Sequence, residues 1–134
     1  LEPLNCPEAV LKLVNNKLDL ENADQEYMVG LYLSTKLYPN VLQVLSIGTA
    51  ETTMVSPKEI FKPAFLSSST RIILVHNHPS GIPTPSEEDR AFTLRICEAG
   101  KLLGIPLVDH LIIGHGKWYS FRDLIEQFQN KRRR

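Results

Sequence analysis

The sequence has no net charge, few cysteines and no long hydrophobic run. Its 15 basic residues balance 15 acidic ones, so it lacks the broad basic field that drives nucleic-acid binding. Only the end, Lys131–Arg134, is locally basic, and a terminal run of like charge is usually solvated. No apolar stretch approaches the roughly 20 residues that a transmembrane helix needs, and no signal-peptide pattern opens the chain.

Cysteine is also scarce. Cys6 and Cys97 are the only two, neither belongs to a C-x-x-C pair, and such sparse use fits a reduced, cytosolic protein. A length of 134 residues with 43% hydrophobic and 22% charged residues is ordinary for one globular domain. The chain starts at Leu1 and not at methionine, which is compatible with a domain cut from a longer protein.

Alternating and continuous apolar patterns predict the strands. In the segment Glu26–Leu33, odd-numbered apolar residues point one way while Glu26 points the other. The run Ile72–Val75 is continuously apolar, which is typical of a central buried strand. The predicted strands are residues 26–33, 41–48, 71–76, 105–113 and 118–121, with turns at 38–40 and 114–116.

Capping residues and helical spacing predict the helices. One opens at Pro7 after Asn5 or Cys6, and a second opens at the capping box Ser56–Glu59, although Pro63 should kink or shorten it. A long helix starts at Ser86 and closes at Gly104, and a short one ends the chain. The predicted buried stripe of the long helix is Phe92, Ile96, Ala99 and Leu103. Together the elements indicate an α/β (α+β) fold with a mixed sheet flanked by helices.

Three side chains near the middle of the chain combine the residue types of a metal site. His76 and His78 are two apart where an apolar strand ends, so they project to the same side with Cα atoms about 6.5 Å apart. Two imidazoles at that spacing can close on one Zn²⁺ with bonds of about 2.0–2.1 Å. Asp89, in the first turn of the next helix, can point back toward them. Three protein ligands leave the fourth position for water, which is typical of a catalytic site.

Each of these residues also has an ordinary interpretation. A histidine at a strand end usually makes a simple hydrogen bond, and Ser86 followed three residues later by Asp89 is how many helices begin. Glu87 and Glu88 suit the positive end of the helix dipole. The metal hypothesis depends on all of these features occurring together within fourteen residues.

The joint pattern, H-x-H, seven residues and then S-x-x-D, resembles the JAMM signature of the JAB/MPN+ metalloprotease superfamily. The fuller text, from His76-Asn77-His78-Pro79-Ser80-Gly81 to Pro85-Ser86 and Asp89, resembles its RadC-type bacterial branch. Further matches are Ser56–Lys62, Asp109–Gly114 and Tyr119–Phe121. The resemblance runs from about Glu26 to Phe121. It implies a mostly antiparallel sheet of JAB/MPN (cytidine deaminase-like) architecture, a single domain over residues 1–134 and a core over 26–121.

The resemblance also implies roles for single residues. One Zn²⁺ per chain would be held by His76, His78 and Asp89, a glutamate on an early strand would be the general base, and a serine would stabilise the tetrahedral intermediate. The serine corresponds to Ser86. The glutamate corresponds to Glu26, with Asp24 and Glu21 as nearby competitors.

The implied function is a zinc-dependent metallopeptidase or isopeptidase whose partner is a peptide or protein with an amide or isopeptide bond. A catalytically idle MPN scaffold and a DNA-repair-associated, RadC-like binding module are the alternatives. The neutral charge argues against nucleic-acid binding through this domain. A zinc deaminase would need a Pro-Cys-x-x-Cys partner motif, which the sequence lacks.

Other polar residues have a supporting role in this interpretation. Asp109 and His110 are predicted to orient the ligands or pack in the core, because no nucleophile-elbow motif accompanies them. His115 is predicted to be a turn residue, and Trp118 and Tyr119 packing groups. Pro63 departs from the family pattern, and the helix-hairpin-helix region common upstream in RadC-type proteins is not present in this sequence.

Overall fold

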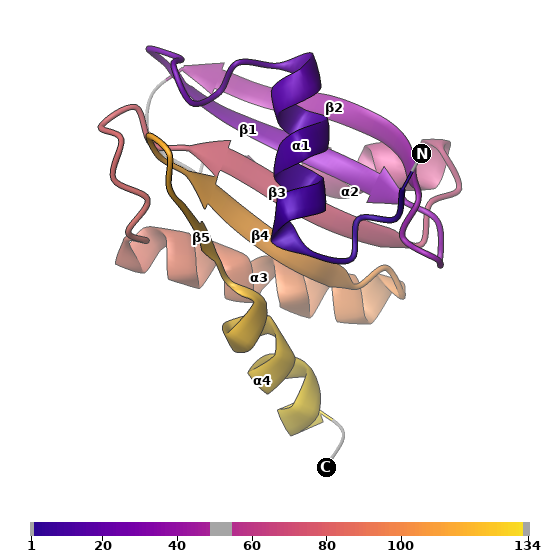
Figure 1. The fold of residues 1–134 in the computed structure, drawn as a ribbon. Helices are drawn as coiled ribbons and strands as arrows, with labels where there is room; N and C mark the ends of the chain where they lie inside the picture. The colour runs from indigo at the N-terminus through magenta and orange to yellow at the C-terminus, as the bar shows by residue number, and fades with distance from the viewer. Residues whose placement is uncertain (1, 49–54, 133–134) are drawn as a thin grey trace.

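A five-stranded mixed sheet lies at the centre of the computed structural model, which describes residues 2–48 and 55–132 (Figure 1). The strand order is β2-β1-β3-β4-β5. The helices and strands are α1 (Pro7–Lys17), β1 (Glu26–Leu33), β2 (Pro39–Gly48), α2 (Pro57–Leu66), β3 (Arg71–Asn77), α3 (Glu87–Leu103), β4 (Leu107–Ile113), β5 (Trp118–Ser120) and α4 (Arg122–Arg132). The order of elements and the mixed architecture agree with the fold expected from the sequence.

Most strand pairs in the sheet are antiparallel. β1 pairs with β2 and with β3 in this way, and β4 pairs with β5 likewise. Among the strands of the described residues, only β3 and β4 are parallel, because the long helix α3 carries the chain back between them, as a parallel connection requires. In the strand order, β1 and β3 both have a neighbour on each side. This interior position explains why they are buried almost throughout.

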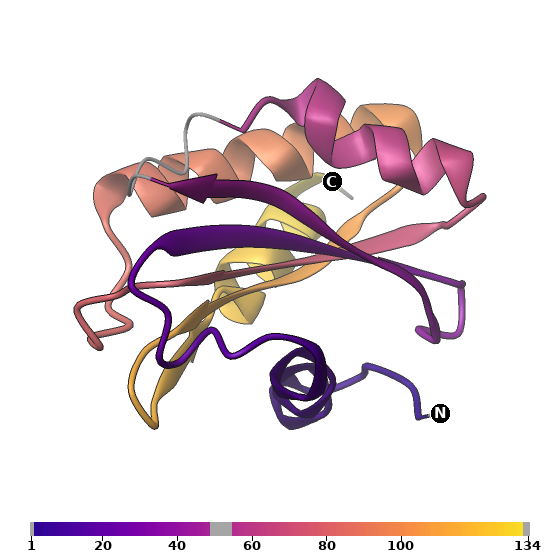
Figure 2. The same ribbon diagram turned by 90° about the horizontal axis from the view of Figure 1, so that it is seen from above.

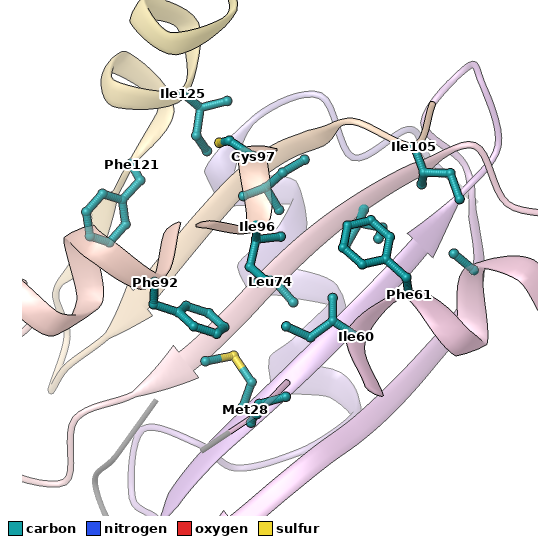
Figure 3. Packing of buried hydrophobic residues seen from close by; sticks show 14 of the residues in the cluster. Met28, Ile60, Phe61, Leu74, Phe92, Ile96, Cys97, Ile105, Phe121 and Ile125 are labelled. Carbon is teal, nitrogen blue, oxygen red and sulfur yellow. The ribbon is translucent and has the colours of Figure 1, made fainter. Parts of the chain in front are cut away.

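Helices cover both faces of the sheet. α1 lies across one face, while α2 and α3 lie on the other (Figure 2). The core under α1 contains Val10, Val14, Val29, Leu31, Ile73 and Val75. The core on the opposite face joins α2, α3 and α4 to the sheet through Met28, Ile60, Phe92, Ile96, Phe121 and Ile125 (Figure 3). β1 contributes to both cores because successive side chains point to opposite faces.

The helix boundaries follow the expected caps. Pro7 opens α1 with Cys6 as the N-cap, and Ser56 caps α2 by accepting a hydrogen bond from the Glu59 amide. α2 continues through Pro63 to Leu66. α3 ends at Gly104, whose φ of 73° is the left-handed conformation that favours glycine there.

Several boundaries and some burial predictions were wrong. Trp118 and Tyr119, which were expected to be packing groups, are 40% and 38% exposed. Pro39 and Asn40 belong to β2, and the turn lies earlier, where the amide of Leu37 donates to Ser34 and Leu37 has a φ of 72°. Leu103 is 43% exposed, because the buried stripe of α3 runs through Thr93, Cys97 and Gly100 and the last turn lies beyond the core. The strand after α3 begins at Leu107 and not Ile105, and β5 ends before Phe121.

Candidate metal centre

Three chain segments meet at one end of the sheet. β3 ends there, β1 begins there and α3 begins there, as Figure 1 shows at the left of the view. In the antiparallel pairing of β1 with β3, Met28 lies opposite His76. Glu26 therefore falls beside His78, although the two are 52 positions apart in sequence. The first turn of α3 adds Asp89.

The side chains of these segments form one cluster. Nε2 of His76 lies 3.2 Å from Nε2 of His78. The Asp89 carboxylate lies 3.4 Å from His76 Nε2 and 3.3 Å from His78 Nε2. Glu26 approaches from the other side, with Oε1 3.9 Å from His78 Nε2. The structure thus brings together all four of the residues that the sequence proposed as ligands or base.

The loop after β3 fixes the ring of His78. Its Nδ1 lies 2.9 Å from the carbonyl oxygen of Ile82, and because a carbonyl only accepts, Nδ1 carries the hydrogen. In the neutral ring Nε2 is then a bare lone pair that points into the cluster. The loop itself is held against the β4–β5 turn: the His78 amide donates to Ile113, and the His115 amide donates to Gly81.

Asp89 has two structural roles at once. Its Oδ2 accepts a hydrogen bond from the Ser86 amide at 2.9 Å, and the Ser86 hydroxyl oxygen accepts one from the Asp89 amide at 3.0 Å. This is the reciprocal capping box that the sequence predicted. Burial alone would raise the pKa of the Asp89 carboxyl, but contacts with His76 and His78 and the Ser86 amide hold that pKa well below its ordinary value. Capping and metal binding are therefore compatible for this residue.

His76 is completely buried, and its second nitrogen is also engaged. Nδ1 of His76 lies 2.8 Å from Nε2 of His110, and Nδ1 of His110 lies 2.7 Å from the hydroxyl of Thr93. Burial lowers the pKa of His76 and lowers that of His110 further, so both rings are neutral at pH 7. For His78 the hydrogen bond with the Asp89 carboxylate has a larger effect than burial, so the pKa of His78 is raised.

Asn77 links the strand of the histidines to the strand of Glu26. Its side-chain oxygen accepts from the Tyr27 amide at 2.7 Å, and its side-chain nitrogen donates to the carbonyl of Gln25 at 3.0 Å. These two groups flank Glu26 on either side. The sequence alone did not single out Asn77 and Thr93 as part of the site. Two features could have indicated them: alternation places the polar Asn77 on the face opposite the two histidines, and Thr93 lies one helical turn after Asp89.

The cluster fits a tetrahedral Zn²⁺. Four ligands at 2.0–2.1 Å from zinc stand about 3.3 Å from one another. The two Nε2 atoms are 3.2 Å apart, Asp89 Oδ1 lies 3.4 Å from Nε2 of His76, and Asp89 Oδ2 lies 3.3 Å from Nε2 of His78. Glu26, His76 and His78 also each offer a ligand atom within 4.8 Å of the others. The ionised Asp89 carboxylate and, in the neutral ring, the unprotonated Nε2 of His78 both present negative charge density to one point, which favours a cation there.

Comparison with known proteins gives a family match over nearly the whole chain. Residues 4–127 match the family described as "RadC-like JAB domain". The chain belongs to this family.

Relatives of this JAB domain occur in bacteria and archaea. A UPF0758 protein of Desulforamulus reducens is 45% identical over 119 residues, which are 89% of this chain and 52% of the relative. One from Shouchella clausii is 42% identical over 120 residues, 90% of this chain and 51% of the relative. One from Methanosarcina acetivorans is 48% identical over 99 residues, 74% of this chain and 43% of the relative. The chain thus spans about half the length of these relatives.

Two further polar residues that the sequence singled out lie at different depths in the JAB domain. Ser86 is exposed at the start of α3, and because its oxygen already accepts from Asp89, its hydroxyl hydrogen can point outward. Asp109 is buried in a separate group, where it accepts from the Ser120 hydroxyl at 2.9 and 2.8 Å and lies 3.6 Å from Arg122.

Within the described residues, no helix has both the length and the apolar character needed to cross a membrane.

Proposed function

We propose that this JAB domain is a zinc-dependent hydrolase of the JAMM class that cleaves an amide bond in a peptide or an isopeptide. The observation that carries the proposal is the cluster of His76, His78 and Asp89. The two Nε2 atoms lie 3.2 Å apart, and each lies 3.4 or 3.3 Å from one oxygen of the Asp89 carboxylate, which is close to the spacing between ligands of a tetrahedral zinc ion. Three protein ligands leave one coordination position vacant, as hydrolytic zinc sites require and closed structural sites do not.

Distance separates the roles of the two carboxylates. Asp89 lies at ligand spacing from both imidazoles, and its backbone and side chain are both held by the helix cap. Glu26 lies further out, 3.9 Å from His78 Nε2, and belongs to a different strand. We therefore assign Asp89 as the third ligand and Glu26 as the general base, beside the vacant coordination position.

The chemistry follows from these positions. Zinc bound here would lower the pKa of a water molecule toward about 7 and polarise the scissile carbonyl. Glu26 would accept a proton from the attacking water and return it to the leaving amine, so that the carboxylate is regenerated in each cycle. Ser86 would donate its hydroxyl hydrogen to the oxygen of the carbonyl as it becomes negative, an interaction worth roughly 2.7–4 kcal/mol in other hydrolases.

The shape of the site is consistent with an extended substrate chain. The cluster lies at the end of the sheet and not in its interior, where loops and a helix terminus meet. β2 is an edge strand, and its last residue, Gly48, lies opposite Glu26. An extended segment that paired with this edge would run toward the base, which is a known way for sheets to bind peptides.

The first experiment separates metal binding from turnover. Purified protein should contain one zinc ion per chain, and a peptide and isopeptide library should reveal cleavage that a chelator abolishes. Glu26→Gln should keep the zinc but lower the turnover rate by about 10²–10⁴-fold, because only the proton acceptor is lost. Asp89→Asn should lose zinc and turnover together.

The contrasting outcomes identify the alternatives. Zinc binding without any cleavage would favour a catalytically idle scaffold. Full activity of Glu26→Gln would place the base elsewhere, and Asp24→Asn and Glu21→Gln are the matched variants for the two neighbouring acids. Zinc-free wild-type protein that stays zinc-free after incubation with the metal would remove the basis of the proposal.

A further inference from the structure

A buried line of hydrogen bonds connects two of the proposed ligands behind the site. It runs from His76 Nδ1 to His110 Nε2 at 2.8 Å, from His110 Nδ1 to the Thr93 hydroxyl at 2.7 Å, and from that hydroxyl to the backbone carbonyl of Asp89 at 2.8 Å. The side chains of His76, His110 and Thr93 are completely buried, so water does not compete for these bonds.

The positions of the hydrogens along this line follow from its last member. A carbonyl oxygen only accepts, so the Thr93 hydroxyl gives its single hydrogen to Asp89. The Thr93 oxygen can then only accept from His110, whose hydrogen must lie on Nδ1. A neutral imidazole with its hydrogen on Nδ1 has a bare Nε2, and this atom accepts from Nδ1–H of His76. Nε2 of His76 therefore carries no hydrogen, and its lone pair is free to bind a metal ion.

We propose that Thr93 and His110 are positioning residues that select the tautomer of His76 in which Nε2 is free to bind the metal ion. This inference rests on the proposed metal site. Ligand histidines commonly donate their second N–H to a carboxylate or a carbonyl. Here the acceptor is another histidine, His110, whose own tautomer depends on its hydrogen bond to Thr93. The Thr93 hydroxyl, one helical turn beyond Asp89, therefore determines the tautomer of His76.

The opposite orientation of the line shows why the hydroxyl decides the outcome. If the Thr93 hydroxyl turned its hydrogen toward Nδ1 of His110, that bond and the hydrogen bond between the two rings would both reverse direction. His76 would then carry its hydrogen on Nε2, which lies 3.2 Å from Nε2 of His78. That hydrogen would occupy the point at which the ion binds. The two orientations thus correspond to a metal-competent and a metal-blocking arrangement of the same residues.

The test compares two substitutions at one position. Thr93→Val has nearly the same shape but no hydroxyl, so in the metal-bound state Nδ1–H of His110 is buried without an acceptor. Thr93→Ser keeps the hydroxyl and removes only a methyl group. Zinc affinity, measured by competition with a chromophoric chelator, should fall about 10–100-fold in Thr93→Val. In Thr93→Ser it should stay within about 3-fold of wild type, because the line is intact.

A second pair of variants tests the other member. In His110→Gln a side-chain oxygen can accept from His76, whereas His110→Phe offers a ring of similar size with no acceptor. The ring contact with Phe121, with centroids 5.0 Å apart, favours an aromatic replacement. A purely structural role for His110 therefore predicts that Phe is the better substitute, and the proposed role predicts that Gln binds zinc more tightly. Urea unfolding checks that each variant is folded at the assay temperature.

Nitrogen NMR of the zinc-loaded protein gives a readout that folding alone does not change. The His110 ring should carry its hydrogen on Nδ1, with Nε2 showing the shift of an unprotonated, hydrogen-bonded nitrogen. A hydrogen on Nε2 of His110, or equal zinc affinity of Thr93→Val and Thr93→Ser, would overturn the inference while leaving the metal site intact. A wild-type protein that binds no zinc would overturn the metal site and this inference together.

Discussion

Asn77 shows how one residue between two proposed ligands can set the position of a third group. Its side chain bonds to the backbone on both sides of Glu26, with contacts of 2.7 Å to the Tyr27 amide and 3.0 Å to the Gln25 carbonyl. The side chain thus adds two hydrogen bonds between β3 and the start of β1, beyond the last backbone pair of these strands. Because Asn77 is completely buried, an altered side chain here leaves polar groups without partners.

The residue-scale prediction concerns this amide. Asn77→Ala should lower the free energy of unfolding by about 1–3 kcal/mol, because two backbone groups lose a buried partner. Urea denaturation measures the change. The matched control is Asn22→Ala, which removes exposed hydrogen bonds to Asp19 and should change stability by less than about 0.5 kcal/mol. Equal stability of the two variants would contradict the bridging role of Asn77.

At the scale of elements, the loop between β3 and α3 is held by close backbone packing. A Cβ atom added to Gly114 would lie 2.3 Å from the carbonyl oxygen of Gly81, nearer than real Cβ atoms approach. Gly81 has a φ of 87° and donates its amide to the carbonyl of His78. The absence of a side chain at Gly114 therefore lets the loop that carries His78 lie directly on the end of β4.

The element-scale prediction follows from that contact. Gly114→Ala should displace the loop and weaken zinc binding by about 10-fold or more, because the ring of His78 is oriented by this loop. Gly116→Ala is the control: its φ of 67° is strained for alanine, but nothing lies within 4 Å of the added atom, so stability should fall while zinc affinity is kept. Chelator competition measures both variants, and equal affinities would show that the packing does not position His78.

Local sequence predicted the elements well and their ends less well. The helix α3 was predicted from Ser86 to Gly104 because both caps are local signals. The turn before β2 was misplaced, because Pro39 suggested a turn, whereas proline is tolerated at the start of an edge strand. The exposure of Leu103 depends on how far the core extends along the helix. Helical periodicity predicts which residues share a face but not where along the helix that face stops being covered.

At the scale of the whole molecule, the proposed site joins elements that the sheet hydrogen bonds and the two cores already hold together. The proposed ligands come from the end of β3 and from α3, so a bound ion would connect an interior strand to the helix that covers it, beside Glu26 of β1. A ligand that binds only the folded state stabilises it by about 2.7 kcal/mol at a free concentration 100-fold above Kd.

Zinc at that excess should therefore raise the melting temperature by several degrees, and a chelator should reverse the shift. His76→Ala should melt at the same temperature with and without zinc, because a ligand is lost. Differential scanning calorimetry of the chelator-treated and zinc-loaded proteins makes the measurement. The same zinc-induced shift in wild type and His76→Ala would mean that the ion binds elsewhere.

The sequence alone determined which residues have metal-binding chemistry and which local elements carry them, because capping and periodicity act over a few residues. The tertiary structure decided how those residues combine. Glu26 lies beside His78 because of the strand register, and His110 reaches His76 because β4 lies parallel beside β3. Thr93 joins them because α3 packs over the same strands. Contacts across 17, 34 and 52 positions depend on pairing and packing, which no local pattern encodes.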